Sequence, residues 1–349
     1  MNNMTKPYFE FDGHSLITPA SIAEALNGHI ATPEETALAD ASSRLSALLD
    51  SALKRFEDGD APRSIIHDVT VALHETRAKE DPSVWQQLIP QTQNHPVATY
   101  FLQDPLTKWS WDKPRGYSGD AHLLDLIYRH PDTAHQVEAA TDLGRELFEY
   151  TSTAPSSMAN CDRRDILARF VDEAAAKHGP ETEVLSVAAG HLREAESSAA
   201  FKNKALKRWA ALDQDPISIA TIAESYGGSI VESVNGSVRD ILTNKAKPGT
   251  FEHVYISGLY DYLTDKVAIK LTQRALEFVK PGGTFLFANY SYPILVDGYL
   301  ETFMNWALLL RSEEDMKRII EASTEGMDVD TEVFFGFNRN IVYGVVRKR

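Results

Sequence analysis

The chain contains 349 residues, with 35 basic and 50 acidic side chains and a formal net charge of −15. The field of so acidic a protein repels phosphate groups, which argues against a nucleic-acid partner. Its single cysteine, Cys161, excludes an internal disulfide and a cysteine-rich metal site, and is typical of a reducing compartment. No apolar run reaches the roughly 20 residues of a membrane span, and residues 1–13 lack the pattern of a secretory signal. We therefore expect a cytoplasmic protein with no membrane partner, and the length predicts two domains.

The first part of the chain has the spacing of helices. Residues 32–35 carry a capping-box residue at each end and a proline at the first helical position, which predicts a helix that runs to about Gly59. A second apolar stripe follows Pro62, and another helix is expected to begin near Asp120. No segment before residue 180 alternates as a strand does. The small, polar, proline-broken segment 150–160 predicts a boundary between a helical domain, 1–155, and a second domain, 156–349.

The second part changes period. A helix expected at 163–177 leads into short apolar runs at 183–190, 208–213, 229–234, 251–257 and 283–288, with helical patterns between them. This alternation predicts a parallel sheet with helices on both faces. Two further runs, 331–337 and 340–346, predict a terminal hairpin and therefore an antiparallel sheet edge.

Three loops after predicted strands carry candidate ligand-binding residues. Gly190 is the one glycine of the first turn, so the match to a dinucleotide fingerprint is weak and a simple tight turn is the alternative. Asp213 ends the second strand, where a carboxylate can accept hydrogen bonds from ribose hydroxyls. Asp215 is expected to cap the next helix. Asp240, after the third strand, could meet an adenine amino group or be a solvated loop residue.

These features together resemble a known family. The glycine turn, Asp213, Asp240, the run 251–262 and VKPGGTFL at 279–286, with its turn at 280–283, are similar to class I S-adenosylmethionine-dependent methyltransferases. LSVAAGHLRE at 185–194, SGLYDYL at 257–263 and KPRGYSGD at 113–120 resemble a subgroup with a helical N-terminal extension. That subgroup includes the methyltransferases of 3-hydroxypalmitate methyl ester biosynthesis and resembles the azetidine-2-carboxylate synthases.

The resemblance implies an α/β fold with a Rossmann-like class I methyltransferase sheet, an antiparallel C-terminal hairpin and an N-terminal α-helical lid domain. It also implies S-adenosylmethionine as methyl donor or as the substrate itself, and no metal. Ala188 and Ala189 stand where many relatives have glycine, which predicts a tighter turn.

Tyrosines gather near the ends of the fourth and fifth predicted strands. A cation over an aromatic face gains about 0.5 to 2 kcal/mol, so these rings could hold a sulfonium. Packing between strand and helix is the alternative for any one of them. The set comprises Tyr255, Tyr260, Tyr262, Tyr290 and Tyr292.

The segment 113–120 is unusual for a helical domain because two glycines flank Tyr117. It could be a lid that brings Tyr117 and Asp120 to the sulfonium, or an ordinary interhelical turn. Arg193 is the candidate for the methionine carboxylate, and Asn289 could orient the reacting group. His67 and His74 have no metal-binding spacing, and segment 296–310 is expected in a core or at a homodimer surface.

Two reactions fit these groups. In methyl transfer to a small acid or amine, Lys113 or Arg115 could pair with an acceptor carboxylate. In cyclisation of S-adenosylmethionine to azetidine-2-carboxylate and methylthioadenosine, Asp120, Asp261 or a tyrosine–asparagine pair could take the proton. A cofactor-binding protein without catalysis is a third alternative. The candidate catalytic residues are Tyr117, Asp120, Tyr260, Tyr262 and Asn289, and the candidate cofactor-binding residues are Arg115, Ser186, Ala188, Gly190, Arg193, Asp213, Gln214, Asp240, Ser257 and Gly258.

Overall fold

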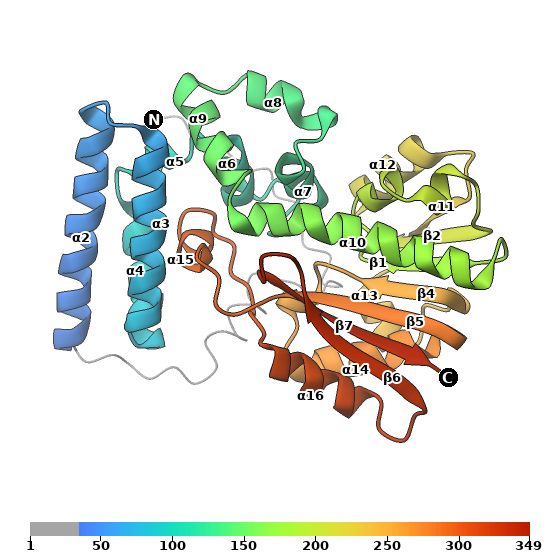
Figure 1. Cartoon of the computed structure of the whole chain (residues 1–349). Coiled ribbons are helices and arrows are strands. Elements are labelled where there is room, and N and C mark those ends of the chain that lie inside the picture. Colours follow the sequence, from blue (N-terminus) through green and yellow to red (C-terminus); the bar gives the residue numbers. More distant parts are fainter. Residues whose placement is uncertain (1–34) are drawn as a thin grey trace. The chain divides into compact units, whose positions relative to one another are not determined.

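The computed structural model describes residues 35–349, which form two compact units (Figure 1). Among the described residues, the helical unit contains residues 35–158 together with Pro293–Leu308. The sheet unit contains Ala159–Tyr292 and Leu309–Arg349. The chain therefore leaves the sheet unit after Tyr292 and returns to it at Leu309.

The helical unit is built from short and medium helices whose first turns are capped by side chains. Asp81, Asp104, Asp120 and Thr141 each accept a hydrogen bond from a backbone N–H one to three residues into the following helix, as sequence patterns of this kind favour. The helices are α2 (Glu35–Glu57), α3 (Pro62–Lys79), α4 (Pro82–Asn94), α5 (Ala98–Phe101), α6 (Pro105–Asp112), α7 (Ala121–Ile127), η1 (Pro131–Thr133), α8 (Ala134–Glu138), α9 (Asp142–Thr151) and α15 (Asp297–Glu301).

The structure confirms the helices expected before Gly59, after Pro62 and after Asp120. Within residues 35–182 it contains no strand. Thr32, Pro33 and Glu34 of the predicted cap lie outside the described residues. No helix within residues 35–349 is both long and apolar enough to cross a membrane.

The proline-broken segment 150–160, where the sequence predicts a domain boundary, is mostly helical. Helix α9 ends at Thr151, and α10 (Pro155–His178) begins after three intervening residues, eight residues before the predicted start at Arg163. A proline in the first turn of a helix loses no intrahelical hydrogen bond, so Pro155 begins a helix here and does not break one.

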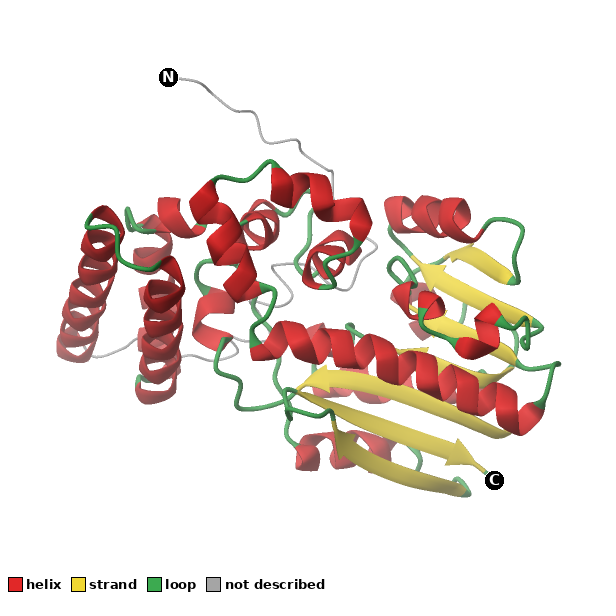
Figure 2. Ribbon diagram, turned by 45° about the horizontal axis from the view of Figure 1, so that its top comes forward, coloured by secondary structure: helices red, strands yellow, loops and turns green. Residues whose placement is uncertain are grey.

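The sheet has seven strands in the order β3-β2-β1-β4-β5-β7-β6 (Figure 2). Strands β1 to β5 pair in parallel, whereas β7 pairs antiparallel with both β5 and β6, which confirms the terminal hairpin. The strands are β1 (Glu183–Val187), β2 (Arg208–Asp213), β3 (Val231–Asn235), β4 (Phe251–Ile256), β5 (Val279–Tyr290), β6 (Val329–Phe335) and β7 (Ile341–Lys348).

The predicted turn at 280–283 lies inside β5, which begins at Val279. The pairing with β4 shifts register between Phe251 and His253 at this point. Gly282 has φ +76°, and a side chain on Gly283 would stand 2.8 Å from the carbonyl oxygen of Glu252. The two glycines therefore allow an irregular but paired strand in place of a separate turn.

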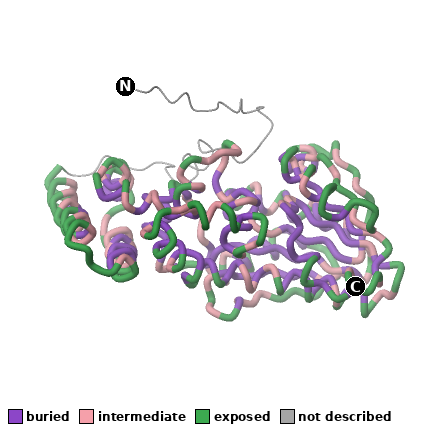
Figure 3. The backbone as a smooth tube through the Cα atoms, turned by 90° about the horizontal axis from the view of Figure 1, so that it is seen from above, coloured by how far each residue is buried: buried purple, intermediate pink, exposed green. Residues whose placement is uncertain are grey.

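Helices cover both faces of the sheet, and its inner strands are mostly buried, whereas the edge strands β3 and β6 are half-buried or exposed (Figure 3). One face packs against α13 (Val238–Leu242), α14 (Asp265–Glu277) and α16 (Glu313–Ser323). The other face meets α10, where Phe170 stacks on His253 and Phe334. The remaining elements are η2 (Arg193–Glu196), α11 (Ala199–Lys202), α12 (Pro216–Tyr226) and η3 (Tyr260–Tyr262).

Candidate functional site

The turn after β1 has an uncommon backbone conformation. Ala188, Gly190 and Leu192 have φ of +55°, +57° and +54°. Glycine adopts this left-handed region freely, whereas alanine and leucine there cost roughly 1 to 2 kcal/mol each. Surrounding contacts hold the turn, because the Tyr226 hydroxyl donates to the Leu192 carbonyl at 2.9 Å. The predicted tight turn is therefore strained at two positions other than glycine.

Asp213, at the end of β2, hydrogen-bonds to the loop after β1 and to the loop after β2. Its carboxylate accepts hydrogen bonds from the backbone N–H of Gly190 and of Asp215, both at 2.8 Å. Burial raises the pKa of Asp213 to about 6, and those two backbone hydrogen bonds act in the opposite direction. Each carboxylate oxygen has further acceptor capacity, so the prediction that Asp213 binds ribose hydroxyls is compatible with this geometry. Gln214 follows it directly.

The loops after β2 and β3 start helices. Asp215 caps α12 by accepting from the Ile217 N–H, as expected. Asp240 belongs to the capping box of α13, and its Oδ2 accepts from the Ser237 N–H at 3.1 Å and from the Ser237 hydroxyl at 2.6 Å. The proposed contact between Asp240 and an adenine amino group stays a prediction, and it would use the other carboxylate oxygen.

Buried charges lie around the carboxyl end of β4. Gly258 has φ +79°, and a Cβ on it would lie 3.6 Å from a guanidinium nitrogen of Arg163. Glu194, in η2, accepts from the Tyr255 hydroxyl at 2.5 Å, and its pKa is raised by burial. Arg193 pairs with Glu196 at 3.0 Å. Sequence reasoning missed Arg163 and Glu194, because nothing in the local pattern distinguishes them from other helix residues.

The five tyrosines differ in burial and in hydrogen-bond partners. Three of them are buried with hydroxyls bonded inside the sheet unit: Tyr255 to Glu194, Tyr260 to Thr272 of α14 at 2.7 Å, and Tyr290 to the Asn160 amide. Tyr292 is 58% exposed. These contacts agree with packing, the alternative for a single tyrosine, and the predicted catalytic role of Tyr260 stays a prediction. Tyr262 is also buried, and its predicted role is unchanged.

Asn289, near the end of β5, belongs to a hydrogen-bond network with residues 309–311, where the chain re-enters the sheet unit. Its Oδ1 accepts from Arg311 at 2.6 Å and its amide donates to the Leu309 carbonyl at 2.8 Å. Arg311, which sequence reasoning also missed, further donates to the carbonyl of Tyr260 at 2.6 Å. Asp261 accepts from the Tyr290 N–H at 2.6 Å. These bonds give Asn289 a positioning role for the end of β5.

The remaining predicted residues belong to the helical unit. Gly116 and Gly119 have φ of +82° and +71°, so the segment 113–120 has the special backbone expected of it. Asp120 caps α7 through the Leu123 N–H and also accepts from the Trp109 indole at 3.0 Å. Arg115 and Tyr117 are half-buried in the same loop.

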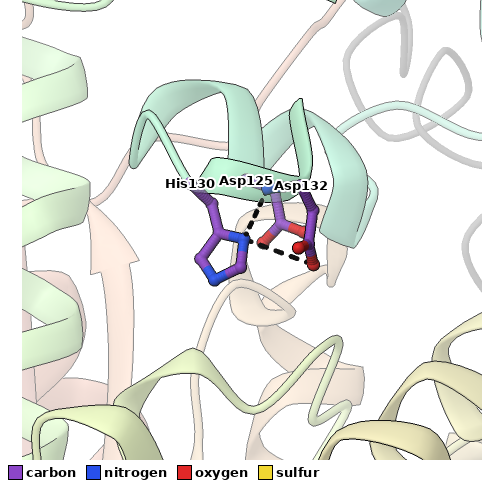
Figure 4. Close-up of side chains that lie close together, drawn as sticks. All are labelled: Asp125, His130 and Asp132. Carbon is purple, nitrogen blue, oxygen red and sulfur yellow. Dashed lines mark hydrogen bonds and ion pairs between the residues drawn. The ribbon is translucent and has the colours of Figure 1, made fainter. Parts of the chain in front are cut away.

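One group of three residues in the described chain has the composition of a metal site (Figure 4). Asp125, His130 and Asp132 lie together where α7 leads into η1. The Nδ1 atom of His130 accepts the Asp132 N–H at 3.3 Å and so caps η1. The arrangement stabilises a turn, and we assign no ion to it.

No protein-family model matches the chain, and no curated protein matches its sequence. Among solved structures, a possible exported protein from Bordetella parapertussis is 16% identical with a TM-score of 0.53, over 88% of this chain and 96% of that one. A putative methyltransferase from Thermobifida fusca YX is 16% identical with a TM-score of 0.48, over 66% and 94%. N-methyltransferase NodS from Bradyrhizobium japonicum WM9, bound to S-adenosyl-L-homocysteine, is 16% identical with a TM-score of 0.40, over 64% and 99%.

The strand order, with its antiparallel β7 between β5 and β6, decides the fold. The sheet unit has the class I methyltransferase fold. In such an open α/β sheet, ligands bind beyond the carboxyl ends of the strands, where the first two loops of this chain meet at Asp213.

Proposed function

We propose that the chain is an S-adenosylmethionine-dependent transferase of small-molecule, secondary metabolism that methylates a small acid or amine. One observation carries the proposal. The strained turn after β1 is hydrogen-bonded to the acidic residue that ends β2, at the place where this fold binds ligands. Backbone strain of this kind persists where the surrounding structure holds it, and it gathers at binding sites.

Each candidate residue has a proposed role that depends on the loop in which it lies. Asp213 and Gln214 would bind the ribose and Asp240 the adenine, while Ser186, Ala188, Gly190, Arg193, Ser257, Gly258 and Arg115 would contact the rest of the nucleoside and its amino-acid end. The protein contributes mainly proximity and orientation, because an ionised carboxylate acceptor needs no base. Lys113 or Arg115 would neutralise such an acceptor.

The alternative is intramolecular cyclisation on the same fold. The α-amine of S-adenosylmethionine would form a bond to its own γ-carbon while the carbon–sulfur bond breaks, releasing methylthioadenosine and azetidine-2-carboxylate. A basic group must take the ammonium proton, and Asp120 and Asp261 are the candidates. A third alternative is binding without catalysis.

Four expectations accompany the proposal. The helical unit would act as a lid through Tyr117, the reaction would need no metal, the protein would work in the cytoplasm without nucleic-acid or membrane partners, and it could form a homodimer. For the lid, Tyr117→Ala should lower turnover more than affinity. Wild-type turnover in that variant would reject the lid.

The deciding experiment incubates the purified chain with S-adenosylmethionine alone and separates the products by mass. Consumption only after an acceptor is added selects methyl transfer. Methylthioadenosine with a four-carbon cyclic amino acid selects cyclisation. Asp213→Ala should weaken binding in both cases, and unchanged affinity would reject the site. Binding without turnover in every assay would leave the non-catalytic alternative.

A further inference from the structure

Strand β6 lies at one edge of the sheet and pairs with β7 on its inner side (Figure 1). Backbone hydrogen bonds join residue 349 to 328 and residue 336 to 341 across this pair. Because bonded and non-bonded pairs alternate in an antiparallel ladder, the even-numbered residues of β6 bond to β7. The odd-numbered residues therefore direct their backbone N–H and C=O groups outward: Val329, Thr331, Val333 and Phe335.

No strand within residues 35–349 pairs with this outer edge. Proteins commonly protect such an edge with a proline, a lysine or a β-bulge, which prevents a further strand from adding. The sequence of β6, VDTEVFF, contains neither residue, and its pairing with β7 runs without a shift in register. The outer edge is therefore a template for another strand.

The outward positions have a symmetric pattern about Glu332, the middle residue of β6. Beyond the two ends of the strand, Met327 and Phe337 are 38% and 67% exposed, and they are two of the five most exposed large apolar side chains in the described chain. An antiparallel copy of the strand, related by a two-fold axis at Glu332, places each residue opposite its equivalent on the other side of the axis. The pairs are Thr331 with Val333, Val329 with Phe335, and Met327 with Phe337.

This register also uses all of the outward backbone groups. Two hydrogen bonds form for each of the four residue pairs within the strands. An axis at Thr331 would leave Phe335 without a strand partner, and an axis at Val333 would leave Val329 without one. The symmetric register therefore makes the most backbone hydrogen bonds.

Local charge favours a second copy of the chain over a basic partner. Glu332 pairs with Arg347 at 2.9 Å, and Asp330 pairs with Arg349, both within the same hairpin. These pairs neutralise the edge in a protein whose net charge is −15, so two copies can approach there. A basic strand would have to displace the arginines. The two Glu332 side chains would lie opposite each other, which limits the strength of the contact.

We propose that β6 pairs with β6 of a second copy of this chain, antiparallel and about a two-fold axis at Glu332, and so joins two seven-stranded sheets into one. Such a contact is self-complementary and closes at two copies. An edge-to-edge contact is smaller than a standard dimer interface, so we expect a reversible dimer with a Kd on the order of 10 µM. The proposal is independent of the reaction that the chain catalyses.

Sedimentation equilibrium of the full chain, from about 1 to 100 µM, measures this Kd. Thr331→Pro removes an outward N–H that β7 does not use, and should weaken the dimer at least 10-fold. Thr331→Ala is the matched control, because it keeps the N–H, and its Kd should stay within twofold of the wild type. Circular dichroism checks folding. If Thr331→Pro does not fold, Thr331→Lys, at the same exposed position, should have the same effect.

The ends of the contact are tested separately. Phe337→Ser should weaken the dimer at least threefold. Its control is Ile217→Ser, because Ile217 is 41% exposed on α12, which packs on β2 and β3, away from β6. The Kd of this control should equal that of the wild type.

Hydrogen exchange identifies the surface. Raising the concentration of the wild type should slow exchange in peptides that cover 329–335 and leave β3, the strand at the opposite edge, unchanged. A wild type that stays monomeric up to 100 µM overturns the proposal. A dimer that folded Thr331→Pro or Thr331→Lys leaves intact also overturns it, as does slower exchange at β3 in place of β6.

Discussion

Among single residues, the turn after β1 shows how neighbouring contacts hold an unfavourable backbone conformation in place. Ala188 and Leu192 occupy left-handed backbone that their side chains disfavour. Asp213 and Tyr226 hold this conformation from β2 and α12. The folded turn therefore carries this conformational cost.

Replacing Ala188 by glycine should release part of this cost. Ala188→Gly is expected to raise the free energy of unfolding of the sheet unit by about 0.5 to 1 kcal/mol, since glycine has no steric penalty at φ +55°. Urea denaturation measures the change. Ala189→Gly is the matched control and should lower stability, because Ala189 is not among the residues with positive φ. Destabilisation by both substitutions would contradict strain at Ala188.

The titration of Asp213 predicts a pH dependence of binding. Its pKa is about 6, so the affinity for S-adenosylhomocysteine should fall about tenfold per pH unit below 6, as the protonated carboxyl stops accepting from ribose. Asp213→Asn should bind weakly with little pH dependence over the same range. Wild-type affinity that is constant between pH 7 and 5 would contradict the role.

The ionisation of Asp213 affects folding stability in the opposite direction from ligand binding. The folded-state pKa of Asp213 lies above its ordinary 3.8, so the folded state binds the proton more tightly than the unfolded state does. Asp213 therefore contributes more stability below pH 4 than above pH 6. Its ionised form is the one suited to the ligand.

At the scale of elements, α15 is held in the helical unit by buried charges. Glu301 pairs with Arg77 of α3 at 2.8 Å and accepts from the indole of Trp85 of α4 at 2.5 Å. Asp297 pairs with His74 at 2.8 Å and also with Arg77. His74 is thus part of a contact between helices α3 and α15.

Removing the arginine should damage this contact. Arg77→Met leaves Glu301 and Asp297 buried with less compensation and should cost about 3 kcal/mol of stability in the helical unit. The control, Arg44→Met, breaks a pair with Glu80 in which Arg44 is mostly exposed, and should cost about 0.5 kcal/mol or less. Thermal unfolding compares the two, and equal effects would argue against a role of burial.

At the scale of the whole molecule, the two units are not two continuous pieces of chain. Pro293–Leu308 follows β5 in sequence but packs in the helical unit, where Phe303 contacts Phe101 with ring centroids 4.6 Å apart. The backbone of Gly298 approaches Leu73 so closely that a Cβ would stand 2.7 Å from its carbonyl oxygen. A cut at the unit boundary therefore divides a core.

A fragment of residues 1–158 should for this reason be poorly stable by itself. We expect its thermal transition to be broad and at least 10 °C below that of the helical unit in the full chain, because the aromatic contacts of 293–308 are lost. Adding a peptide of residues 293–308 should raise the transition. A fragment as stable as the intact unit, with or without the peptide, would contradict the interleaved arrangement.

Much of the fold could be predicted from local pattern. The alternation of short apolar runs with helical spacing predicted the parallel strands, the last two runs predicted the hairpin, and Asp215 was expected to cap its helix. These features depend on residues close together in sequence, so periodicity and capping chemistry are enough. The start of α10 at Pro155 was missed, because a proline can either interrupt a helix or occupy its first turn, and the local pattern does not distinguish the two.

Local sequence pattern was enough to predict the alternating elements and the net acidic charge, and it made the loops after β1, β2 and β3 the candidates for ligand binding. Only the tertiary structure decided that Arg163 meets Gly258, that Tyr260 is enclosed beneath α14, and that 293–308 packs with the helices. These contacts join residues from 12 to more than 200 positions apart. Their energies come from burial and charge pairing between distant segments, and no local sequence pattern reports which segments will meet.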